Sequence, residues 1–216
     1  MKKVLLSAVA LLAFGFANAQ EEEAKTFGFA KGDMFVEGNI NFSTVKEDLG
    51  NGFEDTANSF NFNPKAGYFL TDKIALGVEL GVGSSKLEES SPGGSDESTS
   101  NNFGAGVFAR YYFLDLGQRF KTYTEAGLGF GSRKWETNGV ETQKDSNFGL
   151  GIDLGIQYFV TPKMAINFGL ADVLSFQSGK SEFPGGGETK TTELNGNFNV
   201  FNNFFSAAQF GLTYKF

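Results

Sequence analysis

The chain has 216 residues, a formal net charge of −7, and neither Cys nor His. A negative balance without a visible basic face argues against nucleic acid as a partner, because phosphate binding needs clustered Lys and Arg. The absence of Cys excludes disulfides and a cysteine-linked acyl anchor, so an exported chain of this kind gains its stability from a core or from a bilayer.

The first residues are typical of an export signal. Lys2 and Lys3 precede an apolar run over 4–16, and Ala-Asn-Ala at 17–19 supplies the small residues that a signal peptidase accepts. The apolar run is too short to remain as a membrane-spanning helix. The predicted organisation is a signal peptide over 1–19 that is removed, a short N-terminal segment over 20–32, and one domain over 33–216.

Period-2 alternation of apolar and polar residues recurs along the rest of the chain, without the helical spacing of apolar residues. Alternation predicts strands, because successive strand side chains point to opposite faces. The eight predicted strands cover 33–46, 57–70, 73–86, 102–114, 120–136, 146–160, 163–177 and 196–216.

The connections between these strands alternate between short and long. Tight turns are predicted at 71–72, 115–119 and 161–162. Short turns at one end and long loops at the other predict an all-β, eight-stranded antiparallel up-and-down transmembrane β-barrel, with both termini on the periplasmic side. The long, polar connections cover 47–56, 87–101, 137–145 and 178–195.

One face of the predicted strands is apolar over about 9–11 residues, the length that a tilted strand needs to cross a bilayer. Asp172 interrupts this row in the seventh strand, which predicts a bulge or the membrane boundary there. Trp135, beside Arg133 and Lys134, is predicted to belong to the outer aromatic girdle. The apolar row includes Val36, Ile40, Phe42, Tyr68, Leu76, Val78, Leu80, Val107, Leu128, Phe130, Leu150, Ile152, Ile166 and Phe168.

The opposite face has few charges and many glycines. A lipocalin-like soluble barrel would direct its apolar row inward and a charged row outward to water. Glycine weakens a water-facing strand, yet it lets a narrow barrel close around larger side chains inside it. This favours the outer-membrane barrel. The glycines on this face are Gly67, Gly77, Gly81, Gly83, Gly104, Gly106, Gly127, Gly129, Gly131, Gly149, Gly151, Gly155, Gly169 and Gly211.

Six charged residues lie among these glycines, one on each of the first six predicted strands. Neighbouring strands are about 4.8 Å apart, so charges on adjacent strands can meet in one slab of the lumen. Arg110 is expected to pair with Glu79 and Glu125, and Lys65 with Glu37 and Glu79, because confined charges need partners. The predicted lumen charge cluster consists of Glu37, Lys65, Glu79, Arg110, Glu125 and Asp153.

Asp153 has no cation left, and Gln157, Asn167 and Gln209 are its expected hydrogen-bond neighbours. The cluster favours a structural plug. The alternative is a gated or very narrow path for ions or small solutes, in which removing the Arg110 pairing would open the lumen.

The chain ends as a strand with aromatic and aliphatic residues on one side and Thr213 and Lys215 on the other. Such an ending is usual for a bacterial outer-membrane barrel, although a strand buried on one face in a soluble protein would show the same alternation. The predicted C-terminal assembly signal consists of Phe210, Leu212, Tyr214 and Phe216.

Taken with the signal peptide, several segments resemble the small outer-membrane β-barrel family, of the eight-stranded OmpA/OmpX type, over the whole mature chain. They are the turns Thr71–Leu76 and Thr161–Ile166, the segments Arg110–Phe113 and Glu125–Gly131, and the terminal Phe216. The resemblance implies residence in the outer membrane of a Gram-negative bacterium and insertion by the barrel-assembly machinery. Members serve as structural, adhesive, stress-related or minor channel proteins, and the fold alone does not choose among these roles.

A lipid-modifying barrel enzyme is the third hypothesis, and the composition argues against it. Barrel phospholipases, acyltransferases and omptin-like proteases depend on a His base, and this chain has none. Without a His/Cys cluster or a spaced Asp series, no cofactor or metal is expected.

The expected partners are outer-membrane lipids and lipopolysaccharide. The predicted loops over 47–56 and 87–101 are acidic, and such charge usually serves only to solvate a loop. The alternatives are divalent cations that bridge to lipopolysaccharide, or repulsion of anionic ligands. The loop over 178–195 is long enough for partner contact. An extracellular ligand is therefore expected at these three loops.

Overall fold

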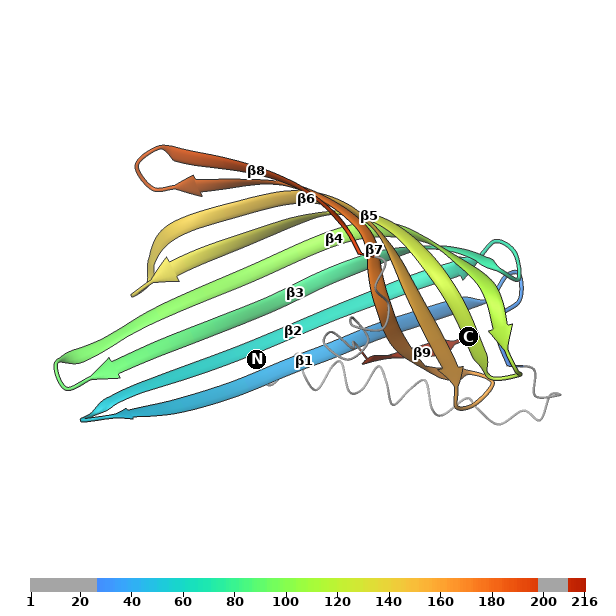
Figure 1. The fold of residues 1–216 in the computed structure, drawn as a ribbon, viewed down its shortest axis with the longest axis horizontal. Helices are drawn as coiled ribbons and strands as arrows, with labels where there is room; N and C mark the ends of the chain where they lie inside the picture. Colours follow the sequence, from blue (N-terminus) through green and yellow to red (C-terminus); the bar gives the residue numbers. More distant parts are fainter. Residues whose placement is uncertain (1–26, 198–209) are drawn as a thin grey trace.

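The computed structural model describes residues 27–197 and 210–216. Within these ranges, no helix is long and apolar enough to cross a membrane. The strands of this part of the chain form one antiparallel sheet (Figure 1). They are β1 (Met34–Gly50), β2 (Phe53–Phe69), β3 (Ile74–Ser91), β4 (Gly94–Leu116), β5 (Phe120–Thr137), β6 (Val140–Phe159), β7 (Met164–Phe183), β8 (Gly187–Gly196) and β9 (Phe210–Lys215).

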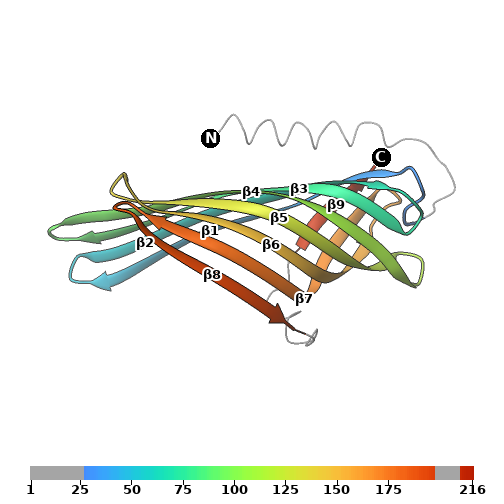
Figure 2. The ribbon, with the colours of Figure 1, turned by 90° about the horizontal axis from the view of Figure 1, so that it is seen from above.

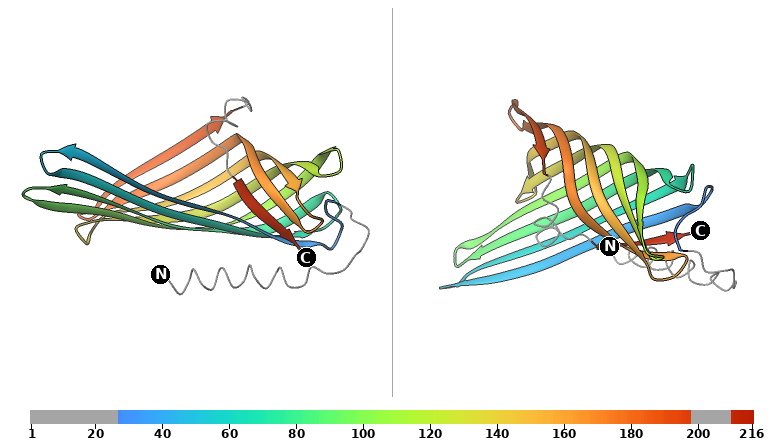
Figure 3. Two further views of the ribbon diagram at one scale, coloured as in Figure 1. Left: turned by 90° about the horizontal axis from the view of Figure 1, so that it is seen from below. Right: turned by 45° about the vertical axis from the view of Figure 1, so that its right-hand side comes forward.

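The sheet closes into a ring. Consecutive strands pair from β1 to β7, and β9 then pairs with both β7 and β1. The ring therefore has eight strands, β1 to β7 and β9. Strand β8 continues the sheet by pairing with the C-terminal half of β7. Figure 3 shows β9 between β1 and β7 near the C terminus. This confirms the predicted eight-stranded antiparallel barrel.

The two ends of the barrel differ. The connections β2–β3, β4–β5 and β6–β7 lie at one end with the C terminus, here named the short-turn end (Figure 1). Four hairpins project from the opposite, hairpin end, and β1–β2 and β3–β4 reach furthest (Figure 2). The first seven strands named from the alternation are present, and most extend further toward the hairpin end than predicted.

The predicted long loops are wrong in one respect, because most of their residues belong to strands. The segment 47–56, for example, contains the ends of β1 and β2 and a turn at Asn51 and Gly52. Both turn residues have positive φ, at 56° and 80°, and Asn138 and Gly139 repeat this with 51° and 77°. Asn-Gly suits such tight hairpin turns, whose twist matches that of the strands, so the ladder continues to the tip.

The eighth predicted strand, 196–216, is described only in part. Its first residue, Gly196, belongs to β8, and its last residues form β9. The predicted neighbour Gln209 lies outside the described residues. The polar segment 178–195 that was predicted to be a loop contributes the end of β7 and most of β8.

The outer face is apolar, as the alternation predicts. Ile40, Leu76, Val78 and Leu128 are each between 45% and 57% exposed, although they are large aliphatic side chains. Exposure of this kind in a continuous band is costly in water and favourable against lipid. Phe130 and Phe148 pack against each other on this face in a tilted arrangement, with ring centroids 5.1 Å apart.

The predicted bulge in β7 is present, and it changes where Asp172 points. The register with β6 shifts twice, between Ile152 and Asp153 and again between Leu154 and Gly155. Between the shifts, Asp172 is opposite Asp153, and both line the same cavity of the lumen. The extra residues therefore turn Asp172 away from the lipid.

Candidate lumen site

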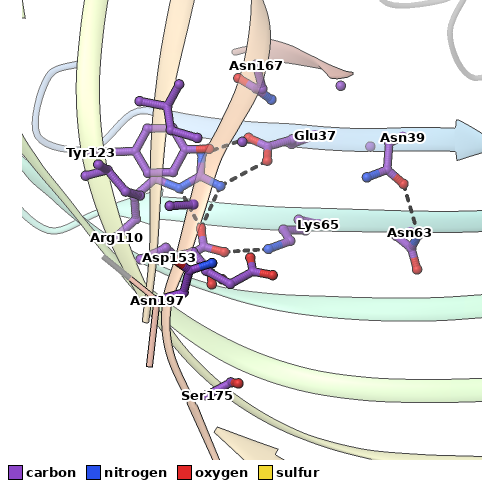
Figure 4. Close-up of a pocket in the computed structure, with 18 of the residues that line it drawn as sticks. Glu37, Asn39, Asn63, Lys65, Arg110, Tyr123, Asp153, Asn167, Ser175 and Asn197 are labelled. Carbon is purple, nitrogen blue, oxygen red and sulfur yellow. Dashed lines mark hydrogen bonds and ion pairs between the residues drawn. The ribbon is translucent and has the colours of Figure 1, made fainter. Parts of the chain in front are cut away.

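Arg110, on β4, is the centre of the lumen charge cluster and is 1% exposed. Its guanidinium donates hydrogen bonds to both carboxylate oxygens of Glu37, at 2.7 and 2.9 Å. Its Nε donates to Glu125 Oε2 at 2.6 Å. A guanidinium presents several donors in a fixed plane, which suits bonding to two carboxylates at once. Figure 4 shows Arg110 pointing toward Glu37 from the opposite wall.

Lys65, on β2, supplies the second cation. Its ammonium lies 3.0 Å from Glu79 Oε2 and also forms an ion pair with Glu125. Glu125 is therefore held by both cations and is 4% exposed. Five of the six predicted cluster residues are joined in one network, with Glu37, Glu79 and Glu125 balanced by Arg110 and Lys65.

The sequence prediction named some wrong partners within this network. It expected Arg110 to pair with Glu79, and Lys65 with Glu37. The structure instead pairs Arg110 with Glu37 and Glu125, and Lys65 with Glu79 and Glu125.

Strand stagger explains the difference. Glu37, Lys65 and Glu79 are Cα partners in one row across β1, β2 and β3. A second row, which includes Arg110 and Glu125, crosses β4, β5 and β6. The rows are displaced at the β3–β4 boundary, because the Cα partner of Arg110 is Ala75 and that of Glu79 is Gly106. Strand tilt and stagger then bring the two rows together across the lumen.

Uncharged side chains from β4, β6, β7 and β9 complete the network. Thr213 donates to Glu37 Oε2 at 3.1 Å, and Gln157 Nε2 donates to Thr213 at 2.9 Å. Tyr112 donates to Gln157 at 2.6 Å, and Asn167 Nδ2 donates to Thr213 at 2.6 Å. A buried carboxylate needs such bonds on its remaining lone pairs. The sequence prediction did not include Tyr112 and Thr213 in the site, although the alternation of residues places both on the inward face.

Asp153, the sixth predicted residue, lies apart from these bonds. Its expected neighbours Gln157 and Asn167 bond to Thr213 instead, so that prediction was wrong for both. Asp153 is a Cα partner of Glu125 and of Asp172. It lines a cavity of about 350 Å³ that adjoins the cluster (Figure 4).

Glycines provide the space for the large inward side chains. A Cβ on Gly67 would lie 2.3 Å from the Phe35 ring, and one on Gly155 would lie 2.3 Å from Tyr123 Cζ. A Cβ on Gly106 would lie 2.7 Å from Glu79 Oε1. The inward glycines therefore have the role that the sequence suggested at these positions, since any larger residue would displace a cluster or aromatic side chain.

A layer of buried aromatic rings lies inside the barrel below the cluster, at the short-turn end. Its buried rings are Phe35, Phe69, Phe108, Tyr112, Tyr123 and Phe159. The Arg110 guanidinium lies 4.2 Å from the centroid of the Tyr123 ring and 5.3 Å from that of Phe35. Cations are attracted to ring faces at such distances. The layer and the cluster are thus in direct contact.

The described part of the N-terminal segment packs into this layer. Phe29 stacks on Phe69 with centroids 4.2 Å apart and also meets Phe35, Tyr112 and Phe159 at 5.2 to 5.8 Å. Backbone bonds hold the segment, since Gly32 N donates to Phe69 O at 2.9 Å. Residues 27–32 therefore occupy the mouth of the barrel.

The end of the chain alternates as predicted. Leu212 and Phe216 are 57% and 62% exposed on the outer side, and Thr213 between them is 3% exposed. Tyr214 and Phe216 form an edge contact with centroids 5.1 Å apart. The backbone of Phe210 begins β9.

Trp135 is on the inner side of its hairpin, so its prediction as part of the outer girdle was wrong. Its Nε1 donates to Asp145 Oδ2 at 2.7 Å, and Arg133 lies over its ring at 5.5 Å. Asp145 also accepts bonds from Gln143 and Ser181 at 2.6 and 2.7 Å. Burial raises the pKa of this carboxyl, but the three hydrogen bonds outweigh that effect and hold it below the ordinary 3.8.

Several charges on the hairpins are paired with one another. Lys46 lies 2.7 Å from Glu54, and Lys86 lies 2.8 Å from Glu97. Across residues 27–197 and 210–216, no group of three or more acidic side chains is arranged to hold a metal ion. The bridging cation suggested by the acidic segments thus has no ligand set in the described chain.

A closed antiparallel ring with an apolar outer face and an ionic lumen defines a transmembrane β-barrel. Residues 6–216 match the family described as outer membrane protein beta-barrel domain, and the chain belongs to this family. It is a protein of the Gram-negative outer membrane, in contact with the lipids of that membrane. In such barrels the short turns are periplasmic and the longer connections extracellular, so we expect the short-turn end to be periplasmic and the hairpin end to be extracellular.

Solved barrels are similar to the chain in fold. OprG from Pseudomonas aeruginosa is 14% identical, with 88% of this chain and 98% of that chain covered and a TM-score of 0.48. Outer membrane protein W from E. coli is 17% identical, with 87% and 99% covered and a TM-score of 0.47. Neisserial surface protein A is 19% identical, with 86% and 100% covered and a TM-score of 0.44. No curated protein matches the sequence.

Proposed function

We propose that the protein is an outer-membrane barrel whose lumen is closed, with a structural or surface-interaction role. The observation that supports this most is the position of Arg110, fully buried between Glu37 and Glu125 on opposite walls. A permeating ion would have to separate these charges in a confined, poorly hydrated space, which is expensive.

The aromatic layer supports the same proposal independently. It lies on the periplasmic side of the cluster and contains rings from β1, β2, β4, β5 and β6 together with Phe29. Rings packed with centroids 4.2 to 5.8 Å apart oppose the passage of a hydrated ion, which supports the proposed closure. A solute would meet two barriers of different chemistry in series.

One observation favours the alternative of a narrow channel for ions or small solutes. The cavity of about 350 Å³ beside the cluster and a second one of about 520 Å³ further toward the hairpin end share Asn63 as a lining residue. Polar space therefore reaches the cluster from outside, and a movement of Arg110 would connect it to the aromatic layer.

We propose no catalytic role. The chain lacks His, and the lumen carboxylates Glu37 and Glu125 are occupied by Arg110 and Lys65. The absence of a base with near-neutral pKa argues against a lipid-modifying barrel enzyme.

We also expect removal of the signal peptide 1–19, whose residues lie outside the described part, leaving a periplasmic segment 20–32 and the barrel 33–216. The barrel-assembly machinery would recognise the C-terminal strand during insertion, and lipopolysaccharide and an extracellular ligand would meet the hairpins.

Single-channel conductance of the refolded mature protein in a planar bilayer tests the closure. We expect a silent wild type and a conducting Arg110→Ala variant, because the substitution removes the charge that joins both walls. Lys73→Ala, at an exposed turn, is the control and should stay silent. Discrete, steady openings in the wild type would overturn the proposal and favour the channel.

A further inference from the structure

A polar hollow of about 520 Å³ lies on the lumen face at the hairpin end, above the charge cluster. Strands β2 to β8 contribute to its wall. This volume falls in the range of about 300–1,000 Å³ that is usual for small-molecule sites. Its lining is dominated by amides and hydroxyls, among them Asn63, Asn102, Asn147, Gln177, Ser132 and Ser181.

Several of these amides are available to a ligand. In the part of the chain that the structure describes, the side chains of Asn102, Asn147 and Gln177 form no hydrogen bond with another protein group. Asn63, by contrast, donates to Asn39 at 2.9 Å. A free amide can donate and accept at the same time, so three of them in one hollow favour a ligand with many hydroxyl groups.

Glycines keep this hollow open and set the amides against its wall. A Cβ on Gly131 would lie 2.5 Å from Oδ1 of Asn147 and 3.4 Å from its Nδ2, so the whole amide lies flat over that glycine. A Cβ on Gly83 would lie 2.2 Å from Asn61 Oδ1 and 2.7 Å from Asn102 Oδ1. The amides are therefore built into the wall in defined positions.

The lining of the hollow carries little net charge. Arg133 faces Asp145 and Glu193 in the lining, whereas the ammonium of Lys180 is paired with Glu182 and Glu188, each at 2.8 Å. One positive group against two negative groups disfavours an anionic ligand and leaves a neutral one unaffected.

An aromatic ring stands beside the hollow. Trp135 contacts two of the lining residues: its Nε1 donates a hydrogen bond to Asp145, and Arg133 lies over its ring. Its amphipathic ring offers an apolar face next to polar groups. Sugars combine hydroxyl groups with apolar C–H faces, so amides beside a Trp match their chemistry.

We propose that this hollow binds an uncharged carbohydrate of one or two sugar units, presented from outside the cell. Asn102, Asn147 and Gln177 would bond to its hydroxyls, with Trp135 at the edge of the site. The inference rests on the proposed function in one respect: if the lumen is closed, a sugar bound in the hollow cannot pass on into the periplasm, so the hollow is a binding site and not part of a transport path.

Trp135 is the one tryptophan of the whole sequence, so its fluorescence reports directly on this region. The refolded mature protein would be titrated with glucose, maltose and N-acetylglucosamine, with glucose 6-phosphate as the charged comparison. Isothermal titration calorimetry would be run on the same samples. We expect a saturable response to at least one neutral sugar in the millimolar range or below.

Asn102→Leu and Asn101→Leu form a matched pair, because neighbouring residues of β4 point to opposite faces and Asn101 is exposed on the outside. We expect Asn102→Leu to weaken the sugar response about tenfold, as for the loss of one or two hydrogen bonds, and Asn101→Leu to leave it unchanged. A heat-dependent shift in gel mobility confirms that each variant has folded.

Three outcomes would overturn the inference: no response to any neutral sugar by either method, an equal loss in both variants, or a response to glucose 6-phosphate alone. Conductance separates this result from the proposed function. A conducting wild type that still binds sugar through Asn102 would leave the site standing and remove the closure. A silent wild type that does not bind sugar would support the closed lumen and rule out the sugar site.

Discussion

Arg110 on β4 and Glu37 on β1 meet across the lumen with two hydrogen bonds, at 2.7 and 2.9 Å, although 73 positions separate them in the chain. The pair links walls that no strand ladder joins directly. Together with Glu125, it forms the charged contact on which the proposed closure of the lumen depends.

Replacing Arg110 by Ala should destabilise the barrel strongly. Glu37 and Glu125 would keep their burial and lose their main partner, and breaking a buried ion pair typically costs about 3–5 kcal/mol. Urea unfolding followed by Trp135 fluorescence measures the effect. Arg110→Lys should recover only part of the stability, since one ammonium cannot reproduce the fork of bonds. Equal stability of Arg110→Ala and wild type would contradict the role assigned to the pair.

Gly77→Ala should destabilise the barrel by about 1–3 kcal/mol, as overpacking does. The new Cβ would lie 2.3 Å from the carbonyl oxygen of Ala66 and 2.3 Å from Phe108 Cζ, and the backbone atom cannot easily move. Gly104→Ala is the matched control, because its Cβ would meet nothing closer than Phe130 O at 3.5 Å. The urea midpoints of both variants measure the effect. An unchanged midpoint for Gly77→Ala would show that the lumen can accommodate an extra methyl group at this position.

Phe29→Ala should release the N-terminal segment from the aromatic layer. The substitution removes the ring stacked on Phe69 at 4.2 Å, worth up to about 3 kcal/mol of burial. Limited trypsin digestion, read by mass spectrometry, should then show faster cleavage after the exposed Lys31. Phe27→Ala, whose ring meets Arg119 at 4.5 Å, is the control and should change cleavage less. Unchanged cleavage in both variants would show that Phe29 does not hold this segment in place.

The hydrogen bonds to Asp145 should make the extracellular hairpin resistant to acid. Since its folded pKa is lowered below the ordinary 3.8, the stabilisation is complete above that value and is lost as the pH falls through the folded pKa. Trp135 fluorescence should stay constant down to about this value and change only below it. Gln143→Leu, which removes one donor at 2.6 Å, should move the transition to higher pH. A transition above the ordinary value in the wild type would reverse the assigned direction.

Phe216→Ala should impair assembly in cells more than stability in detergent. Phe216 is 62% exposed on the outer side, so its loss removes little internal packing. The proposed reading of the C-terminal strand by the assembly machinery would suffer instead. Comparing the folded fraction in outer-membrane extracts with the urea midpoint of refolded protein tests this, and a parallel fall in both would point to packing alone.

Much of this architecture could be predicted from residue alternation. Period 2 identified the lipid-facing side chains, such as Leu76 and Leu128, and the inward glycines, such as Gly67. Asn-Gly at 51–52 and 138–139 was an available signal for tight hairpin tips, and treating those segments as loops overlooked it. Polarity alone is a poor guide there, because both faces of a hairpin that projects from the membrane meet water.

The aromatic layer was less accessible to sequence reasoning. Alternation places Phe35 and Phe108 on the polar, glycine-rich face, but it does not show that their rings meet in one layer inside the barrel. Their burial depends on Gly67 and Gly77 on neighbouring strands and on Phe29 from outside the barrel.

The sequence by itself determined the barrel, its outward and inward faces, and the residue types of the lumen, because a strand sends alternate side chains to opposite sides whatever its neighbours are. The tertiary structure alone decided that Arg110 meets Glu37 and that Asp172 turns inward. Those contacts depend on the stagger between β3 and β4 and on two bulges in β7. Stagger and closure are properties of the whole ring, and a side chain that crosses the lumen finds a partner that no neighbouring strand supplies.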